Sequence, residues 1–312
     1  MSRGSSRPTR PAPGGRSPDG RADGRRREQP QPSGGVLGRL LGPVVPPGMS
    51  AMPAIRTSLA QGFAAVVSSP ALVIGSFVVV LAVWLILLAL GYVGAPFPLT
   101  QAFALPPLST AFDTQYAVAI AGQRTGLIAG LGLLVVRAIV VSLVASAILE
   151  RFEGRRLEGA TAVRALRAAP AVLAAAVLSF VVLFMAQVGA VLGAGFALLL
   201  QVALPALAVY LLGFVPFVAM RRRGSLPETI RLSIAAARTP GGRHLSFCML
   251  YVLIAFFLPW FLPEAAVITA NPSAATWIGI LVMTLVHLAF AGALAYRWLA
   301  VEAGVVEAVP AG

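Results

Sequence analysis

The sequence predicts an all-α integral membrane protein with six transmembrane helices, and three observations favour this fold class. Apolar residues make up 58% of the 312-residue chain and charged residues only 11%, against about 25% charged in a typical soluble domain. From Ala71 onward the chain contains successive apolar runs, each long enough for the roughly 20 residues that a bilayer-spanning helix needs. These runs lack the alternating pattern of barrel strands, so helices are the structure expected to satisfy the backbone in lipid.

The membrane domain is expected to occupy residues 51–301. Its six spans are predicted at 71–93, 127–149, 170–193, 196–220, 245–262 and 276–300. Residues 1–50 are rich in Arg, Pro, Gly and Ser and contain too few large apolar residues to offset the entropy cost of ordering, so they are expected to form a disordered tail. A short second tail is expected at 302–312.

Arginine is distributed unequally among the loops. The N-terminal region and the loops after the second and fourth spans contain many arginines, whereas the alternate loops contain only Arg124. Arginine in short loops stays on the cytoplasmic side during insertion. We therefore expect the protein to lie in a cytoplasmic membrane with both termini in the cytoplasm.

The net charge of +13 would suggest a nucleic-acid partner in a soluble protein. Here the arginines lie in blocks between apolar runs, so anionic lipid head groups are the expected partner and no nucleic acid is expected. The single cysteine, Cys248, excludes an internal disulfide, and two histidines with one cysteine argue against a zinc site. Because no phosphate loop, nucleophile elbow or carboxylate pair is present, we expect no metal, no cofactor and no enzymatic activity.

A short segment with helical spacing of apolar residues precedes the first, third and fifth spans. In the first segment, Ile55, Leu59 and Phe63 recur every four residues. The second segment, 157–168, places Val163 beside Leu166 on the helix surface. Such helices can lie in the membrane interface, where arginine side chains reach lipid phosphates.

The third segment begins with Ser225 and Glu228, which have the spacing of a capping box. It then places Leu226, Ile230 and Ile234 on one face. Across the three segments, the candidate head-group contacts are Arg56, Arg164, Arg167, Arg231 and Arg238. One interpretation is three units, each an interfacial helix followed by a transmembrane hairpin; the other is that loops rich in Ala and Arg look amphipathic by chance.

The segment Ser225-Leu226-Pro227-Glu228, followed by Ile230-Arg231, resembles a broad group of bacterial six-span membrane proteins, as does the basic loop after the second span. This group includes the membrane domain fused to some glycerophosphodiester phosphodiesterases. The resemblance covers the layout of about residues 51–300 and implies a fold. It implies no activity, because no phosphodiesterase domain is present and no catalytic residue can be carried over.

Two ionisable residues stand out inside the predicted spans: Arg137 in the second and His287 in the sixth. Burying such groups in lipid is costly, so they are candidate anion or substrate contacts. Alternatively, Arg137 extends its side chain to the outer interface, which lies only about 9 Å away along the helix. His287 can equally form a hydrogen bond to a neighbouring helix.

Two function classes remain open. The first is a non-enzymatic scaffold or accessory component whose basic cytoplasmic face binds anionic lipid or a partner. The second is a small permease or lipid-handling transporter with a midplane site near Arg137 and His287. Proline residues inside the fourth and fifth spans would suit a broken-helix transporter, but they are equally common as simple kinks.

Overall fold

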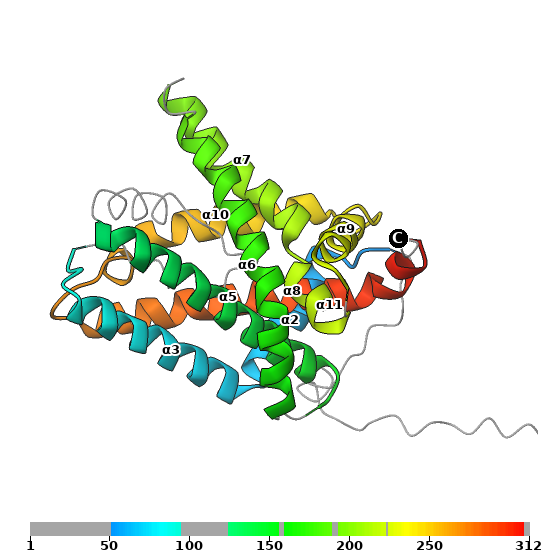
Figure 1. Cartoon of the computed structure of the whole chain (residues 1–312), viewed down its shortest axis with the longest axis horizontal. Helices are drawn as coiled ribbons and strands as arrows, with labels where there is room; N and C mark the ends of the chain where they lie inside the picture. Colours follow the sequence, from blue (N-terminus) through cyan, green and yellow to red (C-terminus); the bar gives the residue numbers. More distant parts are fainter. Residues whose placement is uncertain (1–50, 95–123, 156–158, 189–192, 223, 309–312) are drawn as a thin grey trace, which may run out of the picture.

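The computed structural model describes residues 51–94, 124–155, 159–188, 193–222 and 224–308 (Figure 1). Its elements are α2 (Ile55–Val67), α3 (Pro70–Ala89), α5 (Arg124–Phe152), α6 (Gly159–Val188), α7 (Ala194–Leu212), α8 (Val215–Arg221), α9 (Leu226–Ala237), α10 (His244–Phe261), the short 3-10 turn η3 (Pro263–Ala265) and α11 (Ala274–Ala308). The described residues contain no strand, only an isolated bridge between Met52 and Gly241. The all-α prediction is confirmed. The predicted tail at 1–50 lies outside the described residues.

Within the described residues, five helical segments are long and apolar enough to cross a membrane. They are Pro70–Ala89, Gly159–Ser179, Val202–Arg221, His244–Phe261 and Ala274–Val306. The second predicted span, 127–149, lies within α5, which contains Arg137, Glu150 and Arg151 and is not among these five. A membrane protein with at least five candidate spans is therefore supported, and the sixth span stays a prediction.

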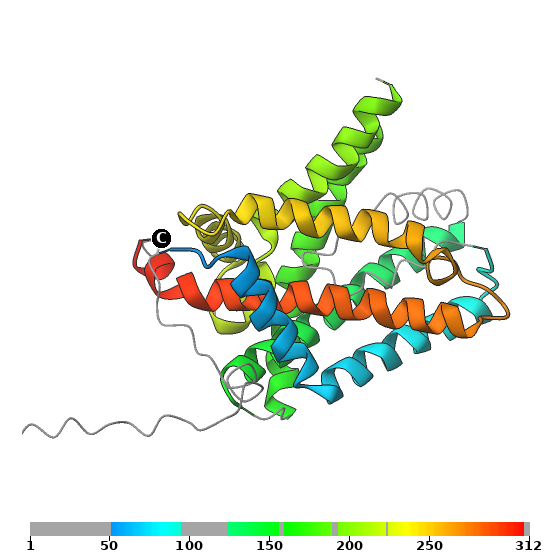
Figure 2. The same ribbon diagram turned by 180° about the vertical axis from the view of Figure 1, so that it is seen from behind.

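The longest helix, α11, is the centre of the packing. It contacts α2, α3, α5, α8, α9, α10 and η3, and its residues Leu294 and Trp298 are completely buried. The long helices α3, α5, α10 and α11 lie broadly along one axis, whereas α6 and α7 form a pair that projects from them at an angle (Figures 1 and 2). Helix α11 continues past the predicted end of its span at residue 300, to Ala308.

Helix α2 packs closely along α11. A Cβ atom built at Gly62 would lie 2.3 Å from the backbone nitrogen of Ala293, and one built at Gly292 would lie 2.7 Å from the carbonyl oxygen of Gly62. Small residues, Ser58, Gly62 and Ala65, therefore form much of the buried face of α2. Of the predicted apolar residues, Ile55 and Leu59 are half-buried against the core, whereas Phe63 is 54% exposed. Helix α2 is a separate helix before α3, as expected, and its location in the membrane interface stays a prediction.

The expected separate helix at 157–168 does not occur as such. Residues from Gly159 onward form the first turns of α6, which continues through Pro170 to Val188. Proline removes one backbone hydrogen bond but is tolerated in membrane helices when neighbouring groups satisfy the freed carbonyl. The third predicted span and the helix before it are thus one element, which weakens the interpretation of three equal units.

The predicted fourth span, 196–220, is interrupted. Helix α7 ends at Leu212 and α8 begins at Val215, with Pro216 in its first turn. The missing N–H of a proline costs nothing in the first turn, whereas its ring would clash with the preceding turn of a continuous helix. Pro205 and Pro259, by contrast, lie inside continuous helices.

Helix α9 begins as the sequence predicts. The Ser225 hydroxyl accepts a hydrogen bond from the backbone N–H of Glu228 at 3.4 Å, and Pro227 lies in the first turn. The buried face of α9 is formed by Thr229, Leu232, Ser233, Ala236 and Ala237, and the helix packs against α7, α8 and α11. The part of the predicted capping box in which Ser225 caps the helix is confirmed.

Candidate functional site

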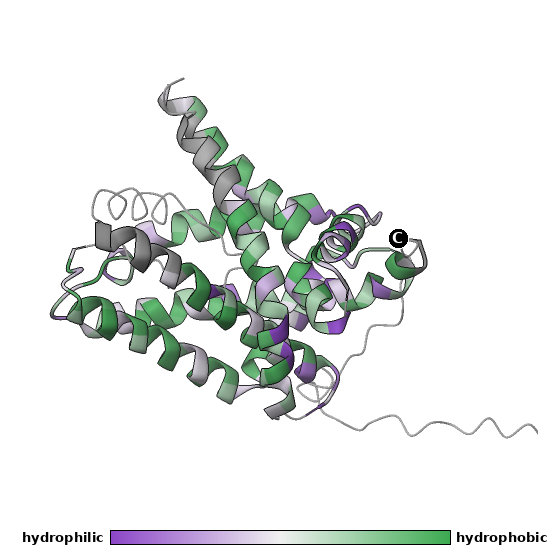
Figure 3. Ribbon diagram, in the orientation of Figure 1, coloured by the Kyte–Doolittle hydropathy of each residue, from purple (hydrophilic) through white to green (hydrophobic). Residues whose placement is uncertain are grey.

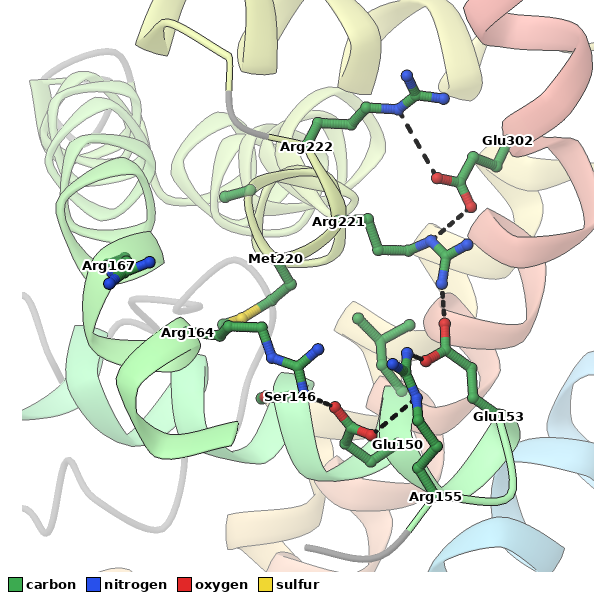
Figure 4. Close-up of a pocket in the computed structure, with 12 residues that line it drawn as sticks. Ser146, Glu150, Glu153, Arg155, Arg164, Arg167, Met220, Arg221, Arg222 and Glu302 are labelled. Carbon is green, nitrogen blue, oxygen red and sulfur yellow. Dashed lines mark hydrogen bonds and ion pairs between the residues drawn. The ribbon is translucent and has the colours of Figure 1, made fainter. Parts of the chain in front are cut away.

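A cavity of about 490 Å³ lies where α5 ends, α6 begins, α8 ends and the C-terminal part of α11 passes (Figure 4). Hydrophilic residues gather at this end of the molecule, whereas the long helices elsewhere are mainly apolar (Figure 3). The polar lining residues are Ser146, Glu150, Glu153, Arg155, Arg164, Arg167, Arg221, Arg222 and Glu302. The cavity thus joins the two arginine-rich loops that the sequence singled out.

Local helix geometry explains how these side chains converge. Arg164 and Arg167 are three residues apart on α6 and therefore lie close together on its surface. Arg221 is the last residue of α8, where a positive charge interacts favourably with the helix dipole. Glu302 belongs to the part of α11 that extends beyond the predicted sixth span.

Six ion pairs between described residues join polar lining residues into one network. Arg164 and Arg155 both pair with Glu150, the second at 3.1 Å. Arg155 also pairs with Glu153, which in turn pairs with Arg221. The ion-pair network therefore extends from the start of α6 across the end of α5 to α8.

The ion-pair network also reaches α11, through Glu302. Its carboxylate lies 2.6 Å from Nε of Arg221 and 3.8 Å from Nε of Arg222 (Figure 4). Arg167 lines the cavity without an ion pair to any residue that the structure describes. Five arginines therefore face three glutamates across the described lining.

Burial separates the two signs of charge. The Glu150 side chain is 5% exposed, whereas those of Arg155 and Arg164 are 54% and 40% exposed. The carboxylates thus lie inside and hold the guanidinium groups toward the opening. The accessible surface of the cavity is cationic, which suits an anion.

A second hollow, of about 530 Å³, follows the outer face of α9. It is lined by Leu226, Pro227, Ile230, Arg231, Ile234, Ala235 and Arg238. The predicted apolar face of α9 thus borders this hollow beside two of the predicted head-group arginines, while Ile230 and Ile234 are half-buried. Of the other three, Arg164 and Arg167 line the first cavity, and Arg56 is exposed on α2.

The structure brings the two intramembrane candidates, Arg137 and His287, together. Arg137 is 7% exposed and His287 1% exposed, and they are close enough to interact electrostatically. The Tyr251 hydroxyl lies 2.9 Å from Nδ1 of His287, so this histidine has the interhelical hydrogen bond considered from the sequence. The burial of Arg137 keeps it from the protein surface in the part of the chain described.

Sequence reasoning missed Arg297, which is completely buried in α11. Its guanidinium donates to the Ser58 hydroxyl at 3.0 Å and to the Gly242 carbonyl at 3.0 Å, and lies 3.2 Å from Nδ1 of His244. It also lies over the Phe247 ring, 4.3 Å from the centroid. The signal was available, because Arg297 falls inside the predicted sixth span between Tyr296 and Trp298.

Among the described residues, no group of three or more His, Cys, Asp or Glu side chains could hold a metal ion. No family model, curated protein or solved structure matches this chain.

Proposed function

We propose that the chain is a non-enzymatic multi-pass protein of the bacterial cytoplasmic membrane, whose basic cytoplasmic side engages anionic lipid head groups. Both termini lie on that side. The membrane location is supported by α3, on which Ile74, Val78, Leu85 and Ile86 are each more than half exposed. Large apolar side chains in such number on one helix are suited to lipid.

The observation that carries the proposal is the two-faced surface of α9. One face packs into the bundle, while Leu226, Ile230 and Ile234 lie on the outer hollow with Arg231 and Arg238. A helix held in this way places apolar side chains among acyl chains and arginines among phosphates. Each arginine near an anionic surface contributes about 1 kcal/mol to membrane attraction.

Depth-dependent quenching tests the position of α9. An Ile230→Cys variant of the full chain carries a fluorophore and is reconstituted in nanodiscs that contain brominated phosphatidylglycerol; the native Cys248 is buried. We expect strong quenching in phosphatidylglycerol, which decreases in an Arg231→Gln/Arg238→Gln background as the attraction to the head groups is lost. The matched Arg231→Lys/Arg238→Lys background retains the charge and is expected to retain the quenching.

An unquenched label in the otherwise unchanged protein would contradict the proposal, since α9 would then face water. Quenching that is equally strong in brominated phosphatidylcholine, and equally strong in the Arg231→Gln/Arg238→Gln background, would show that lipid charge plays no part in the position of α9.

A transporter is the second candidate, favoured by the buried group of Arg137, His287 and Tyr251. If this group binds a moving anion, anion efflux from proteoliposomes is expected to exceed that of empty liposomes. Arg137→Gln is then expected to abolish the excess, because the only cation of the group is lost, while Arg56→Gln retains it. An efflux equal to that of empty liposomes contradicts this function.

A further inference from the structure

We propose that the cavity between α5, α6, α8 and α11 is a binding site for a phosphate group with net negative charge. This inference deepens the proposed function and rests on it for the membrane context, since it gives the basic side a discrete site. The ligand is either the head group of an anionic phospholipid or a soluble phosphate, which share this chemistry.

The unequal numbers of charges indicate that the cavity needs an anion. Five arginines and three glutamates line its described surface, which leaves a net charge of +2. A guanidinium has five N–H donors and no acceptor. The ion pairs engage only part of this set, and Arg167 has no ion-pair partner among the described residues.

The carboxylates position the arginine side chains around the cavity. Glu150 is buried and is already paired with Arg155 and Arg164. Glu302 is 12% exposed and fixes Arg221 at 2.6 Å, while its distance to Arg222 is 3.8 Å. Arginines fixed in this way lose little side-chain entropy when a ligand binds.

The arrangement of donors favours phosphate. Arg164 and Arg167 come from α6, and Arg221 and Arg222 from the end of α8 and the residue after it, on two sides of the opening (Figure 4). A tetrahedral phosphate directs oxygen atoms to several sides at once, whereas a planar carboxylate pairs with one guanidinium edge. The volume of about 490 Å³ is within the range of small-molecule sites and exceeds that needed for one phosphate group.

The test measures binding by the full chain in neutral detergent. Native mass spectrometry follows phosphatidylglycerol, and titration calorimetry follows inorganic phosphate. In the double variant Arg167→Gln/Arg222→Gln, affinity is expected to fall about tenfold or more, because two charge-assisted contacts are lost. These two positions are chosen because Arg167 has no ion pair and Arg222 only a long one, so that the fold is least affected.

Glu302→Gln provides a test of opposite sign. It raises the cavity charge by one and frees N–H donors of Arg221 and Arg222; because this gain is expected to outweigh the lost positioning of Arg221, affinity is expected to rise a few-fold. Arg231→Gln/Arg238→Gln removes the same charge as the double variant from α9, outside the cavity, and is expected to leave the affinity for inorganic phosphate unchanged. It is a control for the phosphate measurement alone, because these two arginines are proposed to contact lipid head groups themselves. If Arg167→Gln/Arg222→Gln fails to fold, the test depends on Glu302→Gln alone. Binding by Glu302→Gln that is equal to or weaker than that of the unchanged protein then overturns the proposal.

The measurements with phosphatidylglycerol and with inorganic phosphate distinguish a lipid head group from a soluble phosphate as the ligand. Binding of phosphatidylglycerol without inorganic phosphate identifies a lipid site, and binding of both identifies a general phosphate site. Binding of neither ligand, or equal affinity in the unchanged protein and both cavity variants, overturns the inference. Loss of quenching at Ile230 with intact cavity binding would instead reject the position of α9 alone.

Discussion

Gly62→Ala is expected to destabilise the protein by about 2–4 kcal/mol, because the added methyl group has no space between α2 and α11. The new Cβ would lie 2.3 Å from the backbone nitrogen of Ala293 and 2.5 Å from the carbonyl oxygen of Ala289. Backbone atoms of a central helix cannot rotate away as a side chain can. Unfolding in detergent, followed by circular dichroism, measures the effect.

The matched control is Gly75→Ala in α3, where no atom lies within 4 Å of the added Cβ. Alanine is better than glycine inside a helix by about 0.5–1 kcal/mol, so this variant is expected to be slightly more stable. If Gly62→Ala were as stable as the control, α2 could not be packed on α11 as described.

Arg297→Ala is expected to cost about 3 kcal/mol of stability and to loosen α2. The substitution removes the donor to the partly buried Gly242 carbonyl and leaves the Ser58 hydroxyl with only its bond to the Ala54 carbonyl; a hydrogen bond to a charged group contributes about 1.5–3 kcal/mol. It also leaves a void beneath Phe247, which adds to the cost. Relief from burying the guanidinium offsets part of this loss.

Thermal unfolding and proteolysis near α2 report the two consequences. Arg297→Lys keeps the charge but cannot reach Ser58 and Gly242 together, so an intermediate loss is expected. Arg56→Ala removes the same charge from an exposed site on α2 and is expected to change stability by less than about 0.5 kcal/mol. An Arg297→Ala protein as stable as Arg56→Ala would show that the hydrogen bonds do not hold α2.

The helical class and the start of α9 could be predicted because both depend on neighbouring residues. Long apolar runs must form helices in lipid, and Ser225 caps a helix through a residue three positions away. The expected division between a separate helix at 157–168 and a span that begins at residue 170 was wrong. The structure has one helix, α6, which continues through Pro170 and packs against α5, α7 and α8.

The charged cavity could be predicted only in part. The sequence indicated Arg164 and Arg167 as head-group contacts, but it did not connect Arg155 with Glu150 or Arg221 with Glu302. These pairings depend on how α5, α8 and α11 cross, and no spacing along the chain specifies such a crossing.

The sequence by itself determined that the chain is helical and suited to a membrane, since hydropathy and backbone hydrogen bonding are properties of each segment alone. It also determined where arginine is concentrated. Only the tertiary structure decided which arginines become structural and which line a cavity, because this depends on contacts between distant helices. Arg297 is bound within the core and Arg167 faces an open cavity, and composition cannot distinguish the two.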